Sequence, residues 1–291
     1  MKMRLLLLAS ILLFSVLFAA CGNQEMRTLP AVSDYMSDTI IETVHLRVGV
    51  VTGPYQDMFE EAILPSLIKM GYTAKFVYYY DYSRPNLALA NNEIDLNIFQ
   101  HYTYLNIFKF EYDLALSAIM EIPTVSMSIF SNRFHSIDEI VPGVTVSIPD
   151  DASNLARALR VLEAAGIINL DPTVERSKAT VTDIVSDPFH IHLIPLPAHD
   201  LVESLGTHDI SVINGNYAVN GGLDITESLF QETLVENYMN VIAVRTEDLN
   251  KQFVRDIIGV VYSDGFRDVI TDPGGNYAGF QRPRWFHDAV R

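Results

Sequence analysis

Short apolar runs alternate with amphipathic stretches along most of this 291-residue chain. His45–Val51 is rich in β-branched residues and ends at a Gly-Pro turn, which is typical of a strand. Gln56–Met70 places apolar residues at helical spacing, and Pro65 inside it predicts a kink. Ala74–Tyr80 is the next apolar run, so the pattern predicts a β-α-β unit of a parallel sheet with helices on its faces.

The same alternation continues toward the C-terminus. It predicts further strands over Ile94–Phe99, Thr124–Phe130, Val144–Ile148, Ile191–Pro195, Ile210–Ile213 and Val241–Val244. It predicts further helices over Pro85–Ala90, His101–Phe108, Ala179–Val185, His199–Leu205, Gln252–Val261 and Phe266–Ile270. Asn92 follows the first of these helices and is expected in the left-handed conformation.

Strand–helix units occur on both sides of a predicted crossing at Pro123–Met127, and a return crossing is expected near Asn240–Arg245. The chain is therefore predicted to be an α/β protein with two lobes joined by two crossing strands. Residues 45–124 plus 245–291 form the first predicted lobe, and residues 125–244 form the second. A cleft between two such lobes is a common site for a small ligand.

The N-terminus has the pattern of an export signal. Two basic residues precede the apolar run Leu5–Ala20, which is shorter than the ~20 residues of a membrane-spanning helix. Phe18-Ala19-Ala20-Cys21 resembles a lipobox, so we expect a signal peptide over residues 1–20, lipidation of Cys21 and a tether over 21–44. The alternatives are an ordinary cleaved signal with a chance cysteine, and a short helix over Tyr35–Val44 in place of part of the tether.

Composition narrows the classes of partner. The formal net charge is −16, which disfavours nucleic acid and anionic lipid surfaces as partners, so a lipid anchor must hold the protein at the membrane. Cys21 is the only cysteine, which leaves no intramolecular disulfide and no cysteine-based metal cluster. The mature domain must therefore be stabilised by burial of its core.

The stretch Ile148–Gly166 combines a strand end, a turn and the start of a helix. Pro149 ends the strand, Asp150 and Asp151 are good N-cap residues, and Gly166 ends the helix. Arg157 lies in the second turn of this helix. A helix start and a nearby guanidinium suit a small carboxylate, whereas the alternative is an arginine exposed to solvent.

Several other polar and aromatic residues follow predicted strand ends, where open α/β sheets bind ligands. The chemistry offered is a set of rings, two amides, an imidazole and a guanidinium, from Tyr82, Phe99, Tyr104, Asn214, Asn240, His101 and Arg157. This set is suited to a small zwitterion with an apolar or thioether tail. For the rings, the alternative is ordinary core packing.

Four motifs carry a resemblance to a known family. They are Asp-Tyr-x-x-Pro-Asn-x-Ala-Leu at 81–89, Phe-Gln-His at 99–101, Ile-Pro-x-Asp-x-x-Asn-x-x-Arg-Ala-Leu at 148–159 and Val-Ile-Asn-Gly-Asn-Tyr-Ala at 212–218. From about His45 to about Arg284 the chain resembles the methionine-binding lipoproteins, the solute-binding components of methionine ABC importers.

The resemblance implies a two-lobed fold like that of periplasmic binding proteins, with L-methionine or a similar zwitterion as ligand. It also implies an ABC permease with its ATPase as partner, and a lipid-anchored position on the extracytoplasmic side of a membrane. Carried over residue by residue, the ligand contacts of the family fall on Tyr82, Phe99, His101, Tyr104, Arg157, Asn214 and Asn240.

The sequence also bears on three other interpretations. The sequence has no nucleophile elbow, phosphate loop or dinucleotide fingerprint, so neither an enzyme nor a cofactor is expected. His190 and His192 alternate on a predicted strand, but two ligands are too few for a metal site. Within the binding class, a methionine-containing dipeptide or another apolar amino acid is the alternative ligand, because the length of the pocket decides between them.

Overall fold

The structure, a computed structural model, describes residues 43–288 and contains two five-stranded sheets. We call the part built on the first sheet the first lobe and the part built on the second sheet the second lobe. The expected signal peptide, Cys21 and nearly all of Tyr35–Val44 lie outside the described residues. Within residues 43–288, no helix has both the length and the apolar character needed to cross a membrane.

The first sheet has the strand order β2-β1-β3-β12-β4. Its strands are β1 Val44–Val51, β2 Tyr72–Tyr79, β3 Leu96–His101, β4 Leu116–Ile122 and β12 Asn240–Arg245. β1 pairs in parallel with β2 and β3, whereas β12 is antiparallel to β3 and β4. The predicted β-α-β unit is therefore confirmed. The antiparallel strand β12, which comes late in the chain, lies between β3 and β4.

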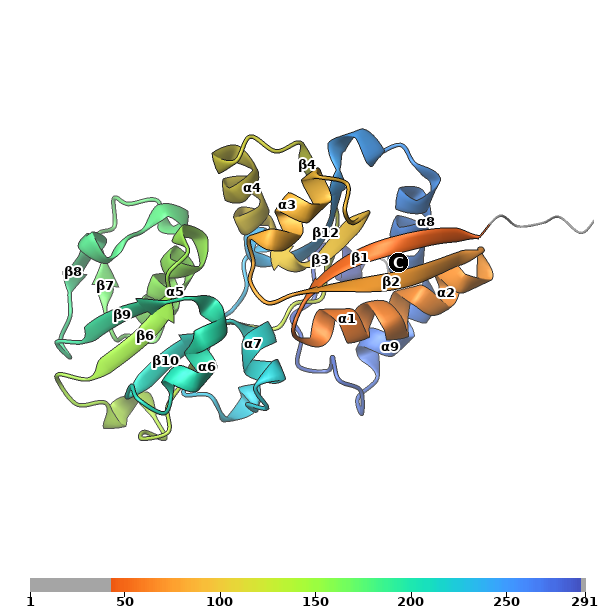
Figure 1. Cartoon of the computed structure of the whole chain (residues 1–291). Helices are drawn as coiled ribbons and strands as arrows, with labels where there is room; N and C mark the ends of the chain where they lie inside the picture. The colour runs from red at the N-terminus through yellow and green to blue at the C-terminus, as the bar shows by residue number, and fades with distance from the viewer. Residues whose placement is uncertain (1–42, 289–291) are drawn as a thin grey trace, which may run out of the picture. The chain divides into compact units, whose positions relative to one another are not determined.

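Helices cover both faces of the first sheet (Figure 1). They are α1 Pro54–Met58, α2 Leu64–Lys69, α3 Arg84–Ala90, α4 Tyr102–Glu111, α8 Gln252–Val261, α9 Asp264–Thr271 and the short α10 Arg284–Asp288. Successive residues of β12 alternate between the faces: Ile242 and Val244 join the core under α1, α2, α8 and α9, and Val241 and Ala243 join the core under α3 and α4. A continuous apolar strand is thus buried on both sides.

Pro65 interrupts the helix after β1, as predicted. A π-helical turn, Phe59–Ile63, separates α1 from α2, and the backbone N–H of Leu64 donates to the carbonyl of Phe59. Proline has no N–H for the regular helical ladder, so the chain closes a wider turn before it. The expected left-handed residue after α3 is also present, with Asn92 at φ 60°.

The second sheet has the order β11-β5-β10-β6-β9. Its strands are β5 Ser128–Phe130, β6 Thr145–Pro149, β9 His192–Leu196, β10 Ile210–Ile213 and β11 Phe230–Gln231, and a separate pair is formed by β7 Asn169–Leu170 and β8 Ile184–Ser186. The helices of this lobe are α5 Ala152–Ala164, α6 Leu201–Ser204 and α7 Gly215–Asn220. Ala158, Leu159 and Leu162 of α5 are fully buried, so this face of the helix packs into the core of the second lobe.

The helix predicted over Ala179–Val185 is wrong. This stretch is one 3₁₀ turn, Val181–Asp183, followed directly by β8. Thr180 and Asp183 form a reciprocal capping box, while Val181 and Val185 are exposed. The capping box closes a single turn and β8 follows it directly, so local side-chain bonds to the backbone determine the conformation here.

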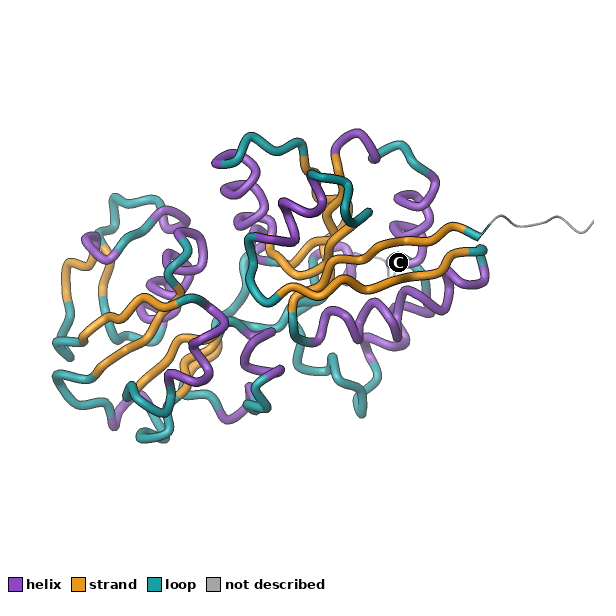
Figure 2. The backbone as a smooth tube through the Cα atoms, viewed as in Figure 1, coloured by secondary structure: helices purple, strands orange, loops and turns teal. Residues whose placement is uncertain are grey.

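The chain passes between the two sheets twice, through residues 123–127 and 232–239 (Figure 2). The first crossing is where the sequence predicts it. The second comes earlier than expected, because Asn240–Arg245 is β12 and pairs with β3 and β4 in the first sheet. Asn240 therefore belongs to the first lobe and not to the second lobe or its crossing.

Gln281 from the C-terminal segment holds the two crossings together. Its side-chain Nε2 donates to Ser126 Oγ at 2.7 Å in the first crossing and to the carbonyl of Glu232 at 2.8 Å in the second. Its Oε1 accepts from the backbone N–H of Leu234 at 2.8 Å. The backbone of Gln281 also pairs with Thr124, so both connections are fixed by one residue.

Candidate functional site

The seven residues predicted for the site line a single cavity of about 320 Å³. They come from the ends of β2, β3 and β10, the starts of β12 and α4, and the second turn of α5. This is the edge at which strands of open α/β sheets end and at which ligands bind. Tyr55, Gln100, Val125, Asn154, Gly215 and Asn216 complete the lining.

A buried ion pair fixes the guanidinium of Arg157. Its Nε lies 2.9 and 3.0 Å from the two carboxylate oxygens of Glu232, and its Nη2 also contacts Glu232. The side chains are only 4 % and 9 % exposed. Burial alone lowers the pKa of Arg157, but the adjacent carboxylate outweighs it, so the pKa is raised above its usual value and the group stays charged.

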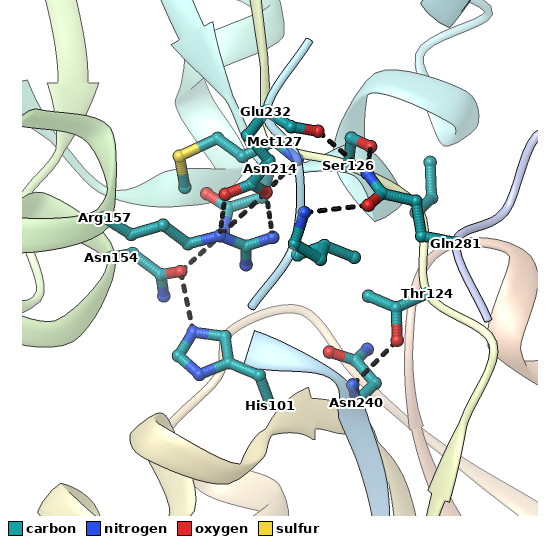
Figure 3. A network of polar contacts seen from close by, with 12 residues as sticks. His101, Thr124, Ser126, Met127, Asn154, Arg157, Asn214, Glu232, Asn240 and Gln281 are labelled. Carbon is teal, nitrogen blue, oxygen red and sulfur yellow. Dashed lines mark hydrogen bonds and ion pairs between the residues drawn. The ribbon is translucent and has the colours of Figure 1, made fainter. Parts of the chain in front are cut away.

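One edge of this guanidinium is left for a ligand. Among residues 43–288, Nη1 of Arg157 has no hydrogen-bond partner, and Figure 3 shows it pointing toward the space above His101 and Asn240. Glu232 binds Nε and Nη2, so the two N–H groups of Nη1 are the donors that Arg157 offers to the cavity.

Two amide oxygens face the same cavity without a donor. Nδ2 of Asn214 donates to Asn154 Oδ1 at 2.8 Å, which turns the buried Oδ1 of Asn214 away from any partner within the described part of the chain. Nδ2 of Asn240 donates to the carbonyl of Phe99 at 3.0 Å, and its Oδ1 accepts from no described residue. The cavity therefore presents one cationic donor and two neutral acceptors.

His101 uses both ring nitrogens within the protein. Its Nδ1 accepts from the backbone N–H of Tyr104 at 3.0 Å and caps α4, so in the neutral ring Nε2 carries the proton. That nitrogen lies 3.2 Å from Asn154 Oδ1 in the second lobe. Burial and the charge of Arg157 lower the pKa of His101 well below its usual value, so the ring is a neutral link between lobes.

The buried environment of His101 predicts that the free energy of unfolding depends on pH. Between the lowered pKa of folded His101 and the value of 6.5 for the unfolded chain, the unfolded state binds more protons. The free energy of unfolding should therefore fall as the pH drops below 6.5, by at most about 1.4 kcal/mol per pH unit for one proton. In His101→Asn, which keeps an N-cap acceptor, denaturant titrations at several pH values should show a shallower fall.

His192→Asn at an exposed position of β9 is the matched control, and it should reproduce the original pH profile. A profile that His101→Asn leaves unchanged would contradict the assignment of a neutral, buried imidazole.

Aromatic rings form one wall of the cavity. Tyr82 stacks on Phe99 with centroids 5.8 Å apart and meets Tyr104 edge-to-face at 5.8 Å. Tyr82 also lies 5.1 Å from Tyr217, a residue of α7 in the second lobe. These rings belong to one apolar cluster, so they are both core packing and cavity lining.

A carboxylate caps the start of α5. Asp151 is the N-cap, and its carboxylate accepts from the backbone N–H of Asn154 at 3.0 Å and from its side-chain Nδ2. Burial raises the pKa of Asp151, against these hydrogen bonds. The predicted helix start is confirmed, and Asp151 takes the backbone N–H of Asn154, which is one of the donors at this helix start.

Hydrogen bonds join the two lobes around the cavity mouth. Tyr82 donates to Asn216 Oδ1 at 2.6 Å, and Asn216 Nδ2 donates to the carbonyl of Thr52 at 3.2 Å. Tyr217 donates to the carbonyl of Tyr80 at 2.9 Å. Together with His101–Asn154, these contacts describe a closed arrangement of the two lobes.

The metal interpretation finds no support in the geometry. His190 lies before β9 in a left-handed conformation, φ 49°, so it does not alternate with His192 on a strand as expected. Residues 43–288 contain no group of three or more His, Cys, Asp or Glu side chains that could hold a metal ion.

Several residues that line the cavity are not among the seven predicted from the sequence. Asn154, Asn216 and Gln100 lie inside the motifs at 148–159, 212–218 and 99–101, so position within a motif was the available signal. Glu232 is an acidic residue at the start of the second crossing, directly after the two-residue strand β11, and nothing in its neighbourhood in sequence indicates a role. Its function depends on a contact 75 positions away in sequence.

A family model described as NlpA lipoprotein matches residues 46–285. The chain belongs to this family. It is 33% identical over 227 residues to the D-methionine-binding lipoprotein MetQ of Yersinia pestis, covering 77% of this chain and 83% of that relative.

Two solved structures extend the comparison. A periplasmic substrate-binding protein of an ABC transporter from Coxiella burnetii has a TM-score of 0.75 and 30% identity, covering 81% of this chain and 99% of the other. A nutrient-binding protein from Burkholderia cenocepacia bound to methionine has a TM-score of 0.74 and 29% identity, covering 78% and 95%. The predicted two-lobed fold is confirmed, and NlpA family membership confirms a substrate-binding protein and not an enzyme.

Proposed function

We propose that this NlpA family member captures methionine outside the cytoplasm and delivers it to an ABC transporter. The observation that carries the proposal is the cavity, which combines one free guanidinium nitrogen, two free amide oxygens and a wall of rings. An α-amino acid carries a carboxylate, an ammonium and a side chain, and these three groups match the donor, the acceptors and the rings in kind. The names of the MetQ relative and of the methionine-bound structure support methionine as that amino acid.

Each part of the ligand has a proposed partner. The carboxylate accepts from Nη1 of Arg157 as a charge-assisted hydrogen bond. The ammonium donates to Oδ1 of Asn214 and of Asn240, one from each lobe. The thioether lies against Tyr82, Phe99 and Tyr104, since sulfur packs favourably against aromatic rings. His101 contributes by holding Asn154, which in turn orients Asn214.

The test is to identify and then titrate the ligand. Mass spectrometry of the denatured, purified domain should detect methionine, and calorimetry of the stripped domain should show binding of methionine. L-Methionine is the expected ligand, and the D-enantiomer is measured beside it because the Yersinia relative is named for that form. If the domain binds neither enantiomer, the proposal is overturned.

The cavity favours a single amino acid over a dipeptide. Tyr104 lines this cavity. It also lines a second cavity, together with Phe108, Tyr112 and Asp151 among others. We therefore expect the ring of Tyr104 to lie between the two spaces and to limit the length of the ligand.

Tyr104→Ala should weaken the binding of L-methionine by about 10- to 100-fold, because one buried aromatic contact is lost. The affinity for alanine, whose side chain does not reach the ring, should fall much less. The affinity for a methionine-containing dipeptide should rise relative to that for methionine, because the two cavities join when the ring is removed. Tyr104→Phe is the control that keeps the ring. Equal losses for methionine and alanine, measured by calorimetry, would make Tyr104 a scaffold residue only.

We also propose the anchored arrangement expected from the sequence: a signal peptide over 1–20, lipid on Cys21 and a tether over 21–44. The first lobe then comprises 45–124 plus the C-terminal part, and the second lobe begins at 125. The permease, with its ATPase, would recognise the two lobes in their closed arrangement.

Cys21→Ser should remove acylation and release the protein from the membrane fraction. Methionine affinity and thermal stability should stay the same, because every residue of the cavity lies within 55–240. Fractionation of cells followed by mass measurement of the protein tests this. An unchanged membrane fraction would contradict the lipobox assignment.

A further inference from the structure

Glu232 lies behind the cavity and is not part of its lining. Its carboxylate binds Arg157 through Nε and Nη2 and accepts from the backbone N–H of Met127 at 2.6 Å. The carbonyl of Glu232 accepts from Gln281, which also donates to Ser126, so the backbone of Glu232 in the second crossing is tied to the first crossing. Glu232 is thus fixed from both ends and is only 9 % exposed.

The ion pair of Arg157 and Glu232 leaves the site without net charge. Of the described residues that line the cavity, Arg157 alone is ionised, since burial keeps His101 neutral. Glu232 cancels the charge of Arg157 before any ligand enters. Asp151, the other nearby carboxyl, is engaged by Asn154 and Ser153.

We infer that Glu232 is a positioning residue that makes the site select ligands with no net charge. It turns Nη1 of Arg157 toward the cavity by holding the other two nitrogens. A zwitterion brings a cation and an anion together, so the buried charges still cancel when it binds. A carboxylate without an ammonium would leave one buried negative charge unbalanced, which is costly in a desolvated site. This inference rests on the proposed methionine function.

The experiment compares two ligands of equal length on the purified domain. L-Methionine has no net charge, and its α-hydroxy analogue has one negative charge and a hydroxyl in place of the ammonium. The unaltered chain should bind the analogue at least about tenfold more weakly. In Glu232→Gln, the dissociation constant of the analogue divided by that of L-methionine should fall by about tenfold or more. The reason is that the negative charge of the analogue now neutralises Arg157.

Two further variants separate positioning from general disruption. Glu232→Asp keeps the charge and should keep the preference for methionine, with weaker binding of both ligands. Glu163→Gln removes a carboxylate of α5 that pairs with Arg176, 3.0 Å away and partly exposed, and should leave the ratio unchanged.

The outcomes are distinct. An analogue that binds the unaltered chain as tightly as methionine would overturn the inference even if Glu232→Gln fails to fold. Methionine binding with the same ratio in Glu232→Gln would overturn it while leaving the proposed function intact. No binding of methionine to the unaltered chain would overturn both.

Discussion

Arg157→Ala is expected to lose at least ~2 kcal/mol of methionine binding, because a buried charge-assisted contact to the ligand carboxylate is removed. The same change should lower the free energy of unfolding by roughly 3 to 5 kcal/mol, since Glu232 is left buried without its partner. Calorimetry with L-methionine measures the first quantity, and denaturant unfolding without ligand measures the second.

Two comparisons separate these effects. Arg160→Ala removes another arginine of the same helix. Arg160 lies 4.8 Å from the ring centroid of Tyr238, and Arg157 lies 5.3 Å from it, but the buried ion pair with Glu232 is made by Arg157. Arg160→Ala should change both quantities far less. The double variant Arg157→Ala, Glu232→Gln should recover much of the stability without recovering binding. Recovery of both, or equal small losses from Arg157→Ala and Arg160→Ala, would show that Arg157 does not contact the ligand.

The sequence predicted most of the fold because hydrophobic periodicity reports which faces are buried. The strands β1 and β10 and the helix α8 follow it closely, and Pro65 marks a real interruption. The prediction failed at 179–185, where a capping box of Thr180 and Asp183 overrides a weak apolar pattern. Such local bonds are invisible to periodicity.

The candidate site was predicted as a set of residues but not as a network. The seven residues meet because strand ends gather at one edge of each sheet, which topology makes predictable. The role of Asp151 as a cap and the edge of Arg157 taken by Glu232 depend on three-dimensional contacts. Asn240 was placed in the wrong lobe, because a strand that returns to the first sheet after the second crossing looks the same in sequence as one that does not.

Gly53→Ala is expected to weaken methionine binding by about thirtyfold or more, corresponding to ~2 kcal/mol, by opposing closure of the lobes. Gly53 has φ 137°, and a Cβ there would lie 2.9 Å from both the Cβ and the carbonyl oxygen of Asn216. Asn216 is the residue of α7 that bonds Tyr82 and Thr52 in the first lobe. The added methyl group would therefore push apart the contacts that join the lobes at the cavity mouth.

The reason to expect an effect on binding is that the proposed ligand contacts come from both lobes. Asn240 and the rings belong to the first lobe, and Arg157 and Asn214 to the second, so methionine favours the arrangement in which all can be reached. Solution scattering should show a smaller radius of gyration with L-methionine for the unaltered chain and little change for Gly53→Ala. Gly143→Ala is the matched control, since Gly143 also has a positive φ, 87°, but has open space around its Cβ position. It should lose some stability to backbone strain and still compact with ligand. Full compaction of Gly53→Ala, or tight binding by the unaltered chain without compaction, would mean that one lobe binds the ligand alone.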